Sequence, residues 1–299
     1  MPPTVCLLGS NNKAIYFSSK GGLPEVVALN FTFENCSKRT NVIKNFAACA
    51  AIEKNTIFLA GGGPSNEAYL LEFTDKKNVT VKDMPKLLNK RCWHGIVYLK
   101  PYVYILGGYD GATSIKNCER LNIFQPSAFE QIQPMVNSRS MFGYSLVNEN
   151  NIYVVGGIEV GSKSIYLDSI EKYNILENRW YLLNIRMPVK LSGISCLAMN
   201  ENTMLLIGGS DSRKKVSNAV YSLDLRKEKI SEKKSLLDHY NETNTMFYYR
   251  DNILFSVGGN PRYNWEVIDF GEKGETTRKL FNHSDAIKSD FNNYCGFIV

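Results

Sequence analysis

Residues 143–157 read GYSLVNENNIYVVGG, two apolar runs that are joined by a polar turn and end on a glycine pair. A short polar turn between two such runs is typical of a β-hairpin. The glycine pair returns in four other places, again after an apolar run: FLAGG (Gly61, Gly62), YILGG (Gly107, Gly108), LLIGG (Gly208, Gly209) and FSVGG (Gly258, Gly259). Successive pairs lie 46 to 52 residues apart. A nearly constant period of this length indicates a repeat architecture.

The segments around each glycine pair predict four strands per repeat. Two strand-like runs precede the pair, and a polar loop, a third run and a less regular fourth run follow it. Four antiparallel strands that repeat around an axis form a β-propeller. We therefore predict an all-β fold, a six-bladed β-propeller with four antiparallel strands in each blade.

The two ends of the chain each lack a strand that the other end supplies. First strands are predicted near residues 46–52, 93–99, 141–148, 193–199, 244–250 and 292–299. The last of these has no glycine-pair strand after it, and the N-terminal run at residues 4–9 has no first strand before it. A blade built from both ends would hide two exposed strand edges. We predict one domain over residues 1–299, with one blade shared by 1–43 and 291–299 and further blades at about 44–90, 91–138, 139–189, 190–240 and 241–290.

The glycine pairs have a structural and a functional interpretation. Glycine allows a sharp turn with positive φ at the end of a strand, close to a neighbouring blade. A phosphate-binding loop would instead require a helix after the glycines. No helical pattern follows any of the pairs, which favours the structural interpretation.

Charge and cysteine usage limit the partners and the compartment. The net charge of +6 is diffuse, unlike the basic stripe of nucleic-acid-binding domains. No apolar run reaches the roughly eighteen residues that a membrane span needs, and the N-terminus has no signal-peptide pattern. Four of the seven cysteines lie in apolar strand-like runs: Cys6, Cys49, Cys196 and Cys295. We expect reduced cysteines, a cytoplasmic location, and neither a nucleic-acid partner nor a membrane.

Several repeats resemble the Kelch motif. Its pattern is an arginine before the first strand, Gly-Gly, an aromatic-Asp-Gly loop, Glu-x-Tyr-Asn in the third strand and a following Trp. The fullest match runs through Arg139, Gly156-Gly157, Glu171-Lys172-Tyr173-Asn174, Trp180 and Met187-Pro188, and the preceding repeat gives Arg91, Gly107-Gly108, Tyr109-Asp110-Gly111 and Glu119. The Trp after the third strand occurs in only one repeat, and the first repeat is degenerate. The resemblance implies a Kelch-type propeller.

The resemblance also implies a function. In BTB–Kelch adaptors, the propeller captures a substrate for a cullin ubiquitin ligase. We therefore expect a protein-interaction module that captures a partner protein or peptide, with any contact to a cullin made by a BTB domain that is not in this chain. The alternatives are a stand-alone Kelch scaffold or actin-associated protein, and a Kelch-fold enzyme such as an oxidase or a sugar epimerase.

The family scheme places the partner at the blade end that carries the loops between strands two and three. Residues just before the first strands and residues after the glycine pairs lie at that end. They are mostly cations and tyrosines, which favour carboxylate or phosphate partners and are enriched at interfaces. We predict an acidic partner at Lys44, Arg91, Tyr109, Asp110, Arg139, Lys190, Arg213, Lys214, Arg262 and Tyr263. One alternative is that Arg91 and Arg139 are scaffold residues that bond to neighbouring loops, and another is that Arg213, Lys214 and Lys215 form only a solvated loop tip.

An enzymatic function has little support in the sequence. The three histidines, at positions 94, 239 and 283, lie in different repeats and form no metal-binding motif. No serine or cysteine lies in a recognisable nucleophile motif. We therefore expect no catalytic residues, no metal and no cofactor.

Overall fold

The computed structural model describes backbone and side chains for residues 42–53, 55–74 and 78–233. Beyond these it describes the backbone of strands at residues 5–9, 13–20, 23–30, 32–34, 245–250, 253–258, 264–269, 276–282 and 294–298. Every named element is a β-strand, so the all-β prediction is confirmed for the described residues. That part of the chain contains no helix that is long and apolar enough to cross a membrane.

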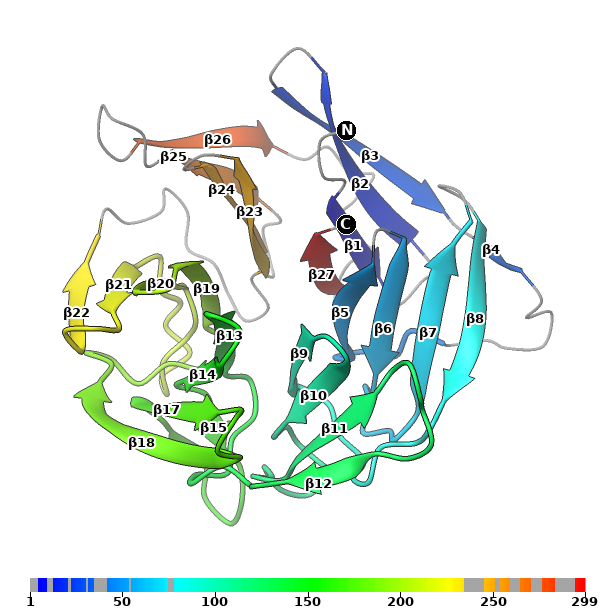
Figure 1. The fold of residues 1–299 in the computed structure, drawn as a ribbon. Helices are drawn as coiled ribbons and strands as arrows, with labels where there is room; N and C mark the ends of the chain where they lie inside the picture. The colour runs from blue at the N-terminus through cyan, green and yellow to red at the C-terminus, as the bar shows by residue number, and fades with distance from the viewer. Residues whose placement is uncertain are drawn as a thin grey trace. The chain divides into compact units, whose positions relative to one another are not determined.

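The chain divides into two compact units. Unit 1 comprises Met1–Ile105, Glu119–Gln131 and Ser284–Val299, and unit 2 comprises Leu106–Cys118 and Ile132–His283. Both are built mainly from four-stranded sheets (Figure 1).

The first sheet of unit 1 joins the two ends of the chain. Its order is β27-β1-β2-β3, from β1 (Val5–Gly9), β2 (Lys13–Lys20), β3 (Leu23–Asn30) and β27 (Tyr294–Ile298). The strands β1 and β27 pair antiparallel, from Val5 opposite Ile298 to Gly9 opposite Tyr294. The N-terminal and C-terminal strands therefore share one sheet, as their complementary patterns predicted.

Unit 1 contains two further sheets. The second comprises β4 (Thr32–Glu34), β5 (Ala48–Glu53), β6 (Thr56–Ala60), β7 (Ala68–Phe73) and β8 (Asn78–Met84). The third comprises β9 (Gly95–Leu99), β10 (Tyr102–Leu106), β11 (Cys118–Asn122) and β12 (Glu130–Ile132). The repeat pattern did not predict β4, which pairs parallel with β8 and so covers the outer edge of the second sheet.

Unit 2 holds three larger sheets and a small hairpin. The first sheet comprises β13 (Gly143–Val147), β14 (Asn151–Val155), β17 (Ser169–Asn174) and β18 (Arg179–Arg186), and β15 (Ile158–Glu159) pairs with β16 (Ile165–Tyr166) beside it. The second comprises β19 (Ser195–Asn200), β20 (Thr203–Ile207), β21 (Val220–Asp224) and β22 (Lys229–Glu232). The third comprises β23 (Thr245–Arg250), β24 (Ile253–Gly258), β25 (Asn264–Asp269) and β26 (Thr276–Asn282). All the strand pairs within these sheets are antiparallel.

The burial of each strand follows from its place in the sheet. The second strands β6, β10, β14 and β20 are buried at every position after the first, so both of their faces are covered. Continuous apolar runs are typical of such strands. In the outer strand β18, exposed positions alternate with covered ones, because one face of an edge strand meets water.

The glycine pairs have the predicted structural role in the described residues. Gly156 and Gly157 have φ values of 61° and 93°. A Cβ on Gly156 would stand 2.6 Å from the carbonyl oxygen of Leu191, and one on Gly157 would stand 2.7 Å from that of Ser140. A larger residue would therefore clash with the backbone that leads into the neighbouring first strand. The fifth pair, at 258–259, lies partly outside the described residues.

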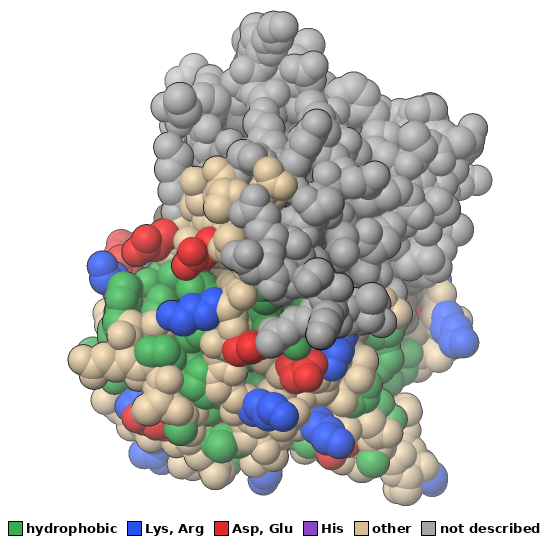
Figure 2. Space-filling model, turned by 90° about the vertical axis from the view of Figure 1, so that its right-hand side faces the viewer, with side chains coloured by type: hydrophobic (Ala, Val, Ile, Leu, Met, Phe, Trp, Pro, Cys, Tyr) green, Lys and Arg blue, Asp and Glu red, His purple; other side chains and the backbone are tan. Residues whose placement is uncertain are grey.

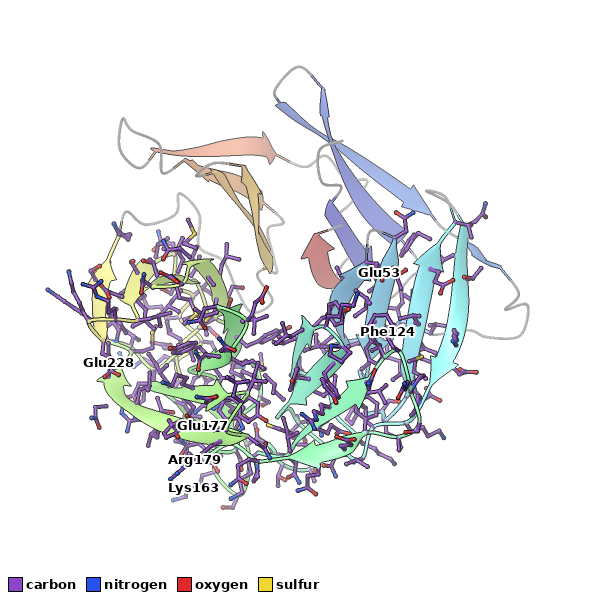
Figure 3. The ribbon with its side chains drawn as sticks, viewed as in Figure 1. Glu53, Phe124, Lys163, Glu177, Arg179 and Glu228 are labelled. Carbon is purple, nitrogen blue, oxygen red and sulfur yellow. The ribbon has the colours of Figure 1, made fainter. Side chains whose placement is uncertain are left out.

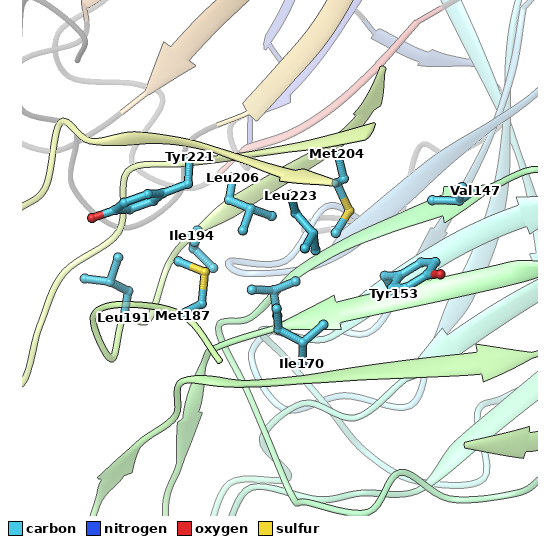
Figure 4. Close-up of a cluster of buried hydrophobic side chains, with 11 residues drawn as sticks. Val147, Tyr153, Ile170, Met187, Leu191, Ile194, Met204, Leu206, Tyr221 and Leu223 are labelled. Carbon is cyan, nitrogen blue, oxygen red and sulfur yellow. The ribbon is translucent and has the colours of Figure 1, made fainter. Parts of the chain in front are cut away.

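Neighbouring sheets of unit 2 share a hydrophobic core. The first sheet contributes residues such as Tyr153, Val155 and Ile170, and the second contributes Met204 and Leu206 (Figure 4). The connection between the sheets adds Met187, Leu191 and Ile194. Each repeat therefore needs its neighbour in order to bury its apolar surface.

A left-handed residue marks the same position before four first strands. It is Phe46, Trp93, Met141 or Gly193, with φ between 50° and 67°. Within unit 1, the Trp93 amide donates to the carbonyl oxygen of Phe46 at 3.1 Å, and within unit 2 the Gly193 amide donates to that of Met141 at 2.6 Å. The left-handed residue is therefore a common reference position, by which the repeats can be aligned whatever their side chains.

The blade count is only partly covered by these observations. Four sheets, from β5 to β22, lie in the part of the chain whose side chains are described. They have the antiparallel four-stranded form of propeller blades, with β4 added to one of them. Closure into six blades and the blade boundaries given above stay predictions.

Candidate functional site

The loops at one end of the unit 2 sheets form the candidate site. In an antiparallel sheet, the connection from strand two to strand three and the connection from strand four to the next sheet emerge at the same end. For the unit 2 sheets these connections are residues 156–168, 187–194 and 208–219, and unit 2 also contains the connections 107–117 and 133–142, which follow β10 and β12. We call this end the loop face of unit 2.

The loop face is built from small hairpins. Tyr109 bridges to Ser114, β15 pairs with β16, and Ser210 bridges to both Ser192 and Val216. Ser192 pairs antiparallel with Ser210, so the connection that carries Lys190 meets the base of the last hairpin.

Two buried serines join the first two hairpins. The hydroxyl oxygens of Ser114 and Ser140 lie 3.0 Å apart, and the Ser114 hydroxyl also lies 3.0 Å from the carbonyl oxygen of Ile158. The Val160 amide donates to Ser114 Oγ at 2.9 Å. These bonds hold the loops at fixed positions relative to the strands below.

Arg91 and Arg139 do not face a partner, which corrects the prediction made for them. Both side chains are completely buried. Arg91 Nη2 pairs with Glu119 Oε1 in unit 1, and Arg139 Nη2 lies 2.5 Å from Glu171 Oε1 in unit 2. Arg139 Nη1 also donates to the carbonyl oxygen of Gly156 at 2.8 Å. These arginines are scaffold residues, as the alternative interpretation proposed.

Each buried pair fastens a loop to a third strand. Glu171 accepts hydrogen bonds from the amides of Val136 at 2.7 Å and Asn137 at 3.0 Å, and Glu119 accepts one from the Leu88 amide at 2.7 Å. Burial lowers the pKa of Arg139, although Glu171 opposes that shift. Burial also raises the pKa of Glu119, although Arg91 opposes it. Several bonds to each ion offset the cost of burying charge.

Lys44 occupies the equivalent position in the second sheet of unit 1, but it is only partly buried. Its ammonium group donates to Ser65 Oγ at 2.9 Å and lies 2.5 Å from Glu67 Oε2. This contact holds the pKa of the Glu67 carboxyl below its usual value. Lys44 therefore already has a carboxylate partner within its own blade.

Lys190 is exposed, but it is one residue out of register with the two arginines. The residue two before the left-handed position is Arg139 in one repeat and Leu191 in the next. The strand pairing places Tyr221 where the previous sheet has Glu171. Leu191 and Tyr221 belong to the same buried apolar cluster. An apolar pair thus replaces the ion pair, and Lys190 is left on the surface.

Tyr109 and Asp110 mainly brace their own turn. The Tyr109 hydroxyl donates to the carbonyl oxygen of Gly111 at 2.9 Å. Asp110 Oδ1 accepts from the amides of Ala112 at 2.8 Å and Thr113 at 2.7 Å. Both side chains are half-buried. The carboxylate of Asp110 is therefore used to form the turn.

Arg213 and Lys214 lie on the exposed tip of the last hairpin. Asp211 Oδ1 accepts from the amides of Arg213 at 2.8 Å and Lys215 at 2.9 Å, and the Lys214 amide donates to the Asp211 carbonyl oxygen at 2.9 Å. These bonds fix the backbone and direct a run of cations into solvent. The remaining two predicted residues, Arg262 and Tyr263, lie outside the described residues.

The set of predicted site residues omits three exposed cations of the same loops. They are Lys116, Lys163 and Lys215. Figure 3 shows Lys163, from the turn between β15 and β16, at the outer edge of unit 2. All three follow a glycine pair and precede a third strand. Applying that positional rule to every repeat, and not only to the motif residues, would have included them.

The described residues offer no catalytic constellation. No three His, Cys, Asp or Glu side chains among them are placed to hold a metal ion. Burial raises the pKa of Cys92 to about 11 and also raises that of Cys196, which keeps both thiols protonated. Cys49, Cys92, Cys118 and Cys196 form no disulfide.

Comparison with known proteins gives the chain its family context. The Kelch motif model matches residues 145–184. Kelch-like protein 40 of Xenopus laevis is 29% identical over 52% of this chain and 25% of its own length. Kelch-like protein 35 of Mus musculus is 25% identical over 55% of this chain and 27% of its own length.

A viral relative matches a longer part of the chain. The Kelch repeat and BTB domain-containing protein 1 of Horsepox virus is 24% identical over 70% of this chain and 37% of its own length. The chain thus spans a quarter to little more than a third of these curated relatives. The matched motif contains Arg139's partner Glu171 and most of the first sheet of unit 2. Residues 145–184 therefore match a Kelch motif, and the proteins that this chain resembles are Kelch-like and BTB–Kelch proteins.

Proposed function

We propose that this chain is a protein-interaction module that captures an acidic partner protein or peptide at the loop face of unit 2. We further propose that it is the substrate-recognition part of a cullin-type ubiquitin ligase adaptor and works in the cytoplasm. The Kelch-like and BTB-containing relatives support the adaptor part of this proposal. Contact with the cullin would then be made by a BTB domain, such as the one named in the viral relatives. Closure of the repeats into a six-bladed ring belongs to the same proposal.

The observation that carries the proposal is the sorting of charge on the loop face. Six cations are exposed and form no ion pair with any described residue: Lys116, Lys163, Lys190, Arg213, Lys214 and Lys215. Three carboxylates of the same loops have internal partners. Asp110 and Asp211 accept backbone amides, and Asp168 lies 3.8 Å from Arg186. The fourth carboxylate, Glu159, is half-buried in β15.

In the view of Figure 2, Lys and Arg side chains are interspersed with Asp and Glu side chains and with apolar surface. Mixed signs of this kind are typical of a solvated surface. The loop face instead presents positive charge to a partner and uses its negative charge internally.

An acidic ligand gains directly from this arrangement. A hydrogen bond between a charged group and its partner is worth about 1.5–3 kcal/mol, and the hairpin tip offers adjacent cations on a fixed backbone. Exposed ion pairs are screened by salt, with a Debye length of about 8 Å at physiological ionic strength. Binding should therefore weaken as the salt concentration rises.

Charge reversal of the hairpin tip tests the proposal. The variant R213E/K214E/K215E should reduce affinity for acidic peptides by tenfold or more, because it turns three attractive contacts into repulsive ones. The probes are peptides selected from a random display library on the wild-type chain, and their dissociation constants are measured by fluorescence anisotropy at two salt concentrations. The selected peptides should be rich in Asp, Glu or phosphorylated residues.

The matched control changes the same charge at the opposite end of the same sheet. The variant R226E/K227E/K229E alters the turn between β21 and β22 and should leave affinity within about twofold. Selection of neutral peptides, or equal losses in both variants, would reject the acidic-ligand proposal. The ligase role is tested separately, by measuring the ubiquitylation of a captured partner in cells. Ubiquitylation that does not depend on residues 213–215 would contradict the ligase role.

A further inference from the structure

His94 occupies a position that is apolar in every other described repeat. It follows the left-handed residue Trp93, and the residues at the same place are Ala47, Phe142 and Ile194. Its side chain is only 5% exposed. An ionisable ring thus stands where the repeats otherwise place a hydrophobic side chain.

The ring of His94 packs against the end of β6. A Cβ built on Gly61 would stand 2.7 Å from Cε1 and 3.3 Å from Nδ1 of the imidazole. The ring therefore lies in the joint between the second and third sheets of unit 1. Neither of its nitrogens has a hydrogen-bond partner among the described residues. The neutral ring can occupy this apolar position, although it packs less well than a hydrophobic side chain. A protonated ring would have no hydrogen-bond partner among the described residues.

The ionisable groups around this joint do not favour a proton on the ring. Arg91 is the nearest charged group on the same loop, and its partner Glu119 is already bound to it and to the Leu88 amide. Lys44, whose Cβ lies beside Gly62, is paired with Glu67. Cys92 is adjacent in the chain, and its thiol stays neutral. A protonated His94 would add a third cation to this region, where the described residues offer no free carboxylate.

We propose that His94 makes the joint between the second and third sheets of unit 1 acid-labile, because protonation of its ring is coupled to opening of the joint. This inference concerns the fold and does not depend on any partner. Burial, aided by Arg91, lowers the pKa of His94 well below its ordinary value of 6.5. The opened chain binds a proton below about pH 6.5, whereas the closed chain does not. Stability is therefore full above that pH and is lost as the pH falls below it.

The test compares the wild-type chain with His94→Phe, which copies the residue at position 142. Urea unfolding is measured from pH 7.5 to pH 5.0. The ratio of the unfolding constant of the wild type to that of the variant should rise about tenfold for each pH unit below 6.5, because the wild type binds one additional proton on unfolding. Parallel pH dependence in the two chains would overturn the proposal. His239 and His283 are present in both chains, so their titration cancels.

Three further experiments keep the proposal testable if His94→Phe does not fold. His94→Ile, which copies position 194, should show the same loss of pH dependence. Hydrogen exchange of the wild type, corrected for the intrinsic rate, should show protection lost at pH 5.5 in β6 and β9 before the other described strands. A native-state NMR titration in which the His94 ring shows an ordinary pKa near 6.5 would reject the coupling.

Discussion

Replacing Arg139 with alanine is expected to lower the free energy of unfolding by about 3–5 kcal/mol, because it leaves Glu171 buried without its counter-ion. Both side chains are completely buried. The substitution also removes the donor that binds the carbonyl oxygen of Gly156, at the end of β14. The measurement is urea unfolding at neutral pH, monitored by fluorescence.

A matched control is available in the same sheet. Arg186 lies 3.8 Å from Asp168, and both side chains are partly exposed. Exposed pairs contribute about 0–1 kcal/mol, so Arg186→Ala should change stability by less than about 1 kcal/mol. If Arg139→Ala is no more destabilising than Arg186→Ala, the buried pair does not hold the loop as described.

The neighbouring repeat indicates how the loss can be recovered. There Leu191 and Tyr221 replace the ion pair and join the apolar core. Replacing a buried ion pair by apolar residues of similar volume is often neutral or stabilising. The double variant Arg139→Leu with Glu171→Tyr should therefore be more stable than Arg139→Ala. A double-mutant cycle that adds the single variants Arg139→Leu and Glu171→Tyr measures the coupling of the two positions.

The fold was largely predictable because its determinants are local and repeated. Each glycine pair ends a run such as YVVGG that only a buried strand explains, and the unmatched runs at the two ends predicted the pairing of β1 with β27. The added strand β4 was not predictable in this way. It has no equivalent in the other repeats, and its pairing with β8 is parallel and distant in sequence.

The site was less predictable because the charge of a side chain does not indicate whether that side chain is buried. Arg139 and Lys190 both precede a first strand, yet one is completely buried and the other is exposed. Their partners decide the difference. A glutamate stands in the third strand of each repeat that has the arginine, at Glu119 and Glu171, and a tyrosine stands there in the repeat with Leu191. Comparing the repeats pair by pair would have identified the scaffold arginines.

The left-handed residues show how the repeats align with one another, which the amino-acid composition does not show. If the repeats are aligned by their cations, Lys190 is equivalent to Arg139. If they are aligned by the residue with positive φ, Leu191 is equivalent to Arg139. A positive φ at Met141 or Phe46 has no sequence signature, because these residues rarely adopt it. The backbone register therefore shows that the exposed positive charge of the loop face comes from other loop cations and not from the motif arginine Arg139.

Removal of the C-terminal strand, by deletion of residues 294–299, is expected to abolish the soluble folded state. The deletion takes away β27, which pairs with β1 along its whole length and also lies against β5. A domain has only about 5–15 kcal/mol of net stability, and an exposed strand edge promotes aggregation. Size-exclusion chromatography and thermal melting measure the result. Deletion of Val299 alone, which leaves β27 intact, is the control and should have little effect.

A circular permutant separates loss of the strand from loss of chain connectivity. Val5 lies opposite Ile298 in the antiparallel ladder, so a short linker between the two original ends would turn β27 and β1 into an ordinary hairpin. New ends can be placed between Ser162 and Lys163, which are both exposed. The permutant should fold and melt at or above the wild-type temperature, because the linker reduces the entropy of bringing the two strands together. A soluble deletion variant with an unchanged melting temperature, or a permutant that cannot fold, would show that the two ends do not complete one sheet.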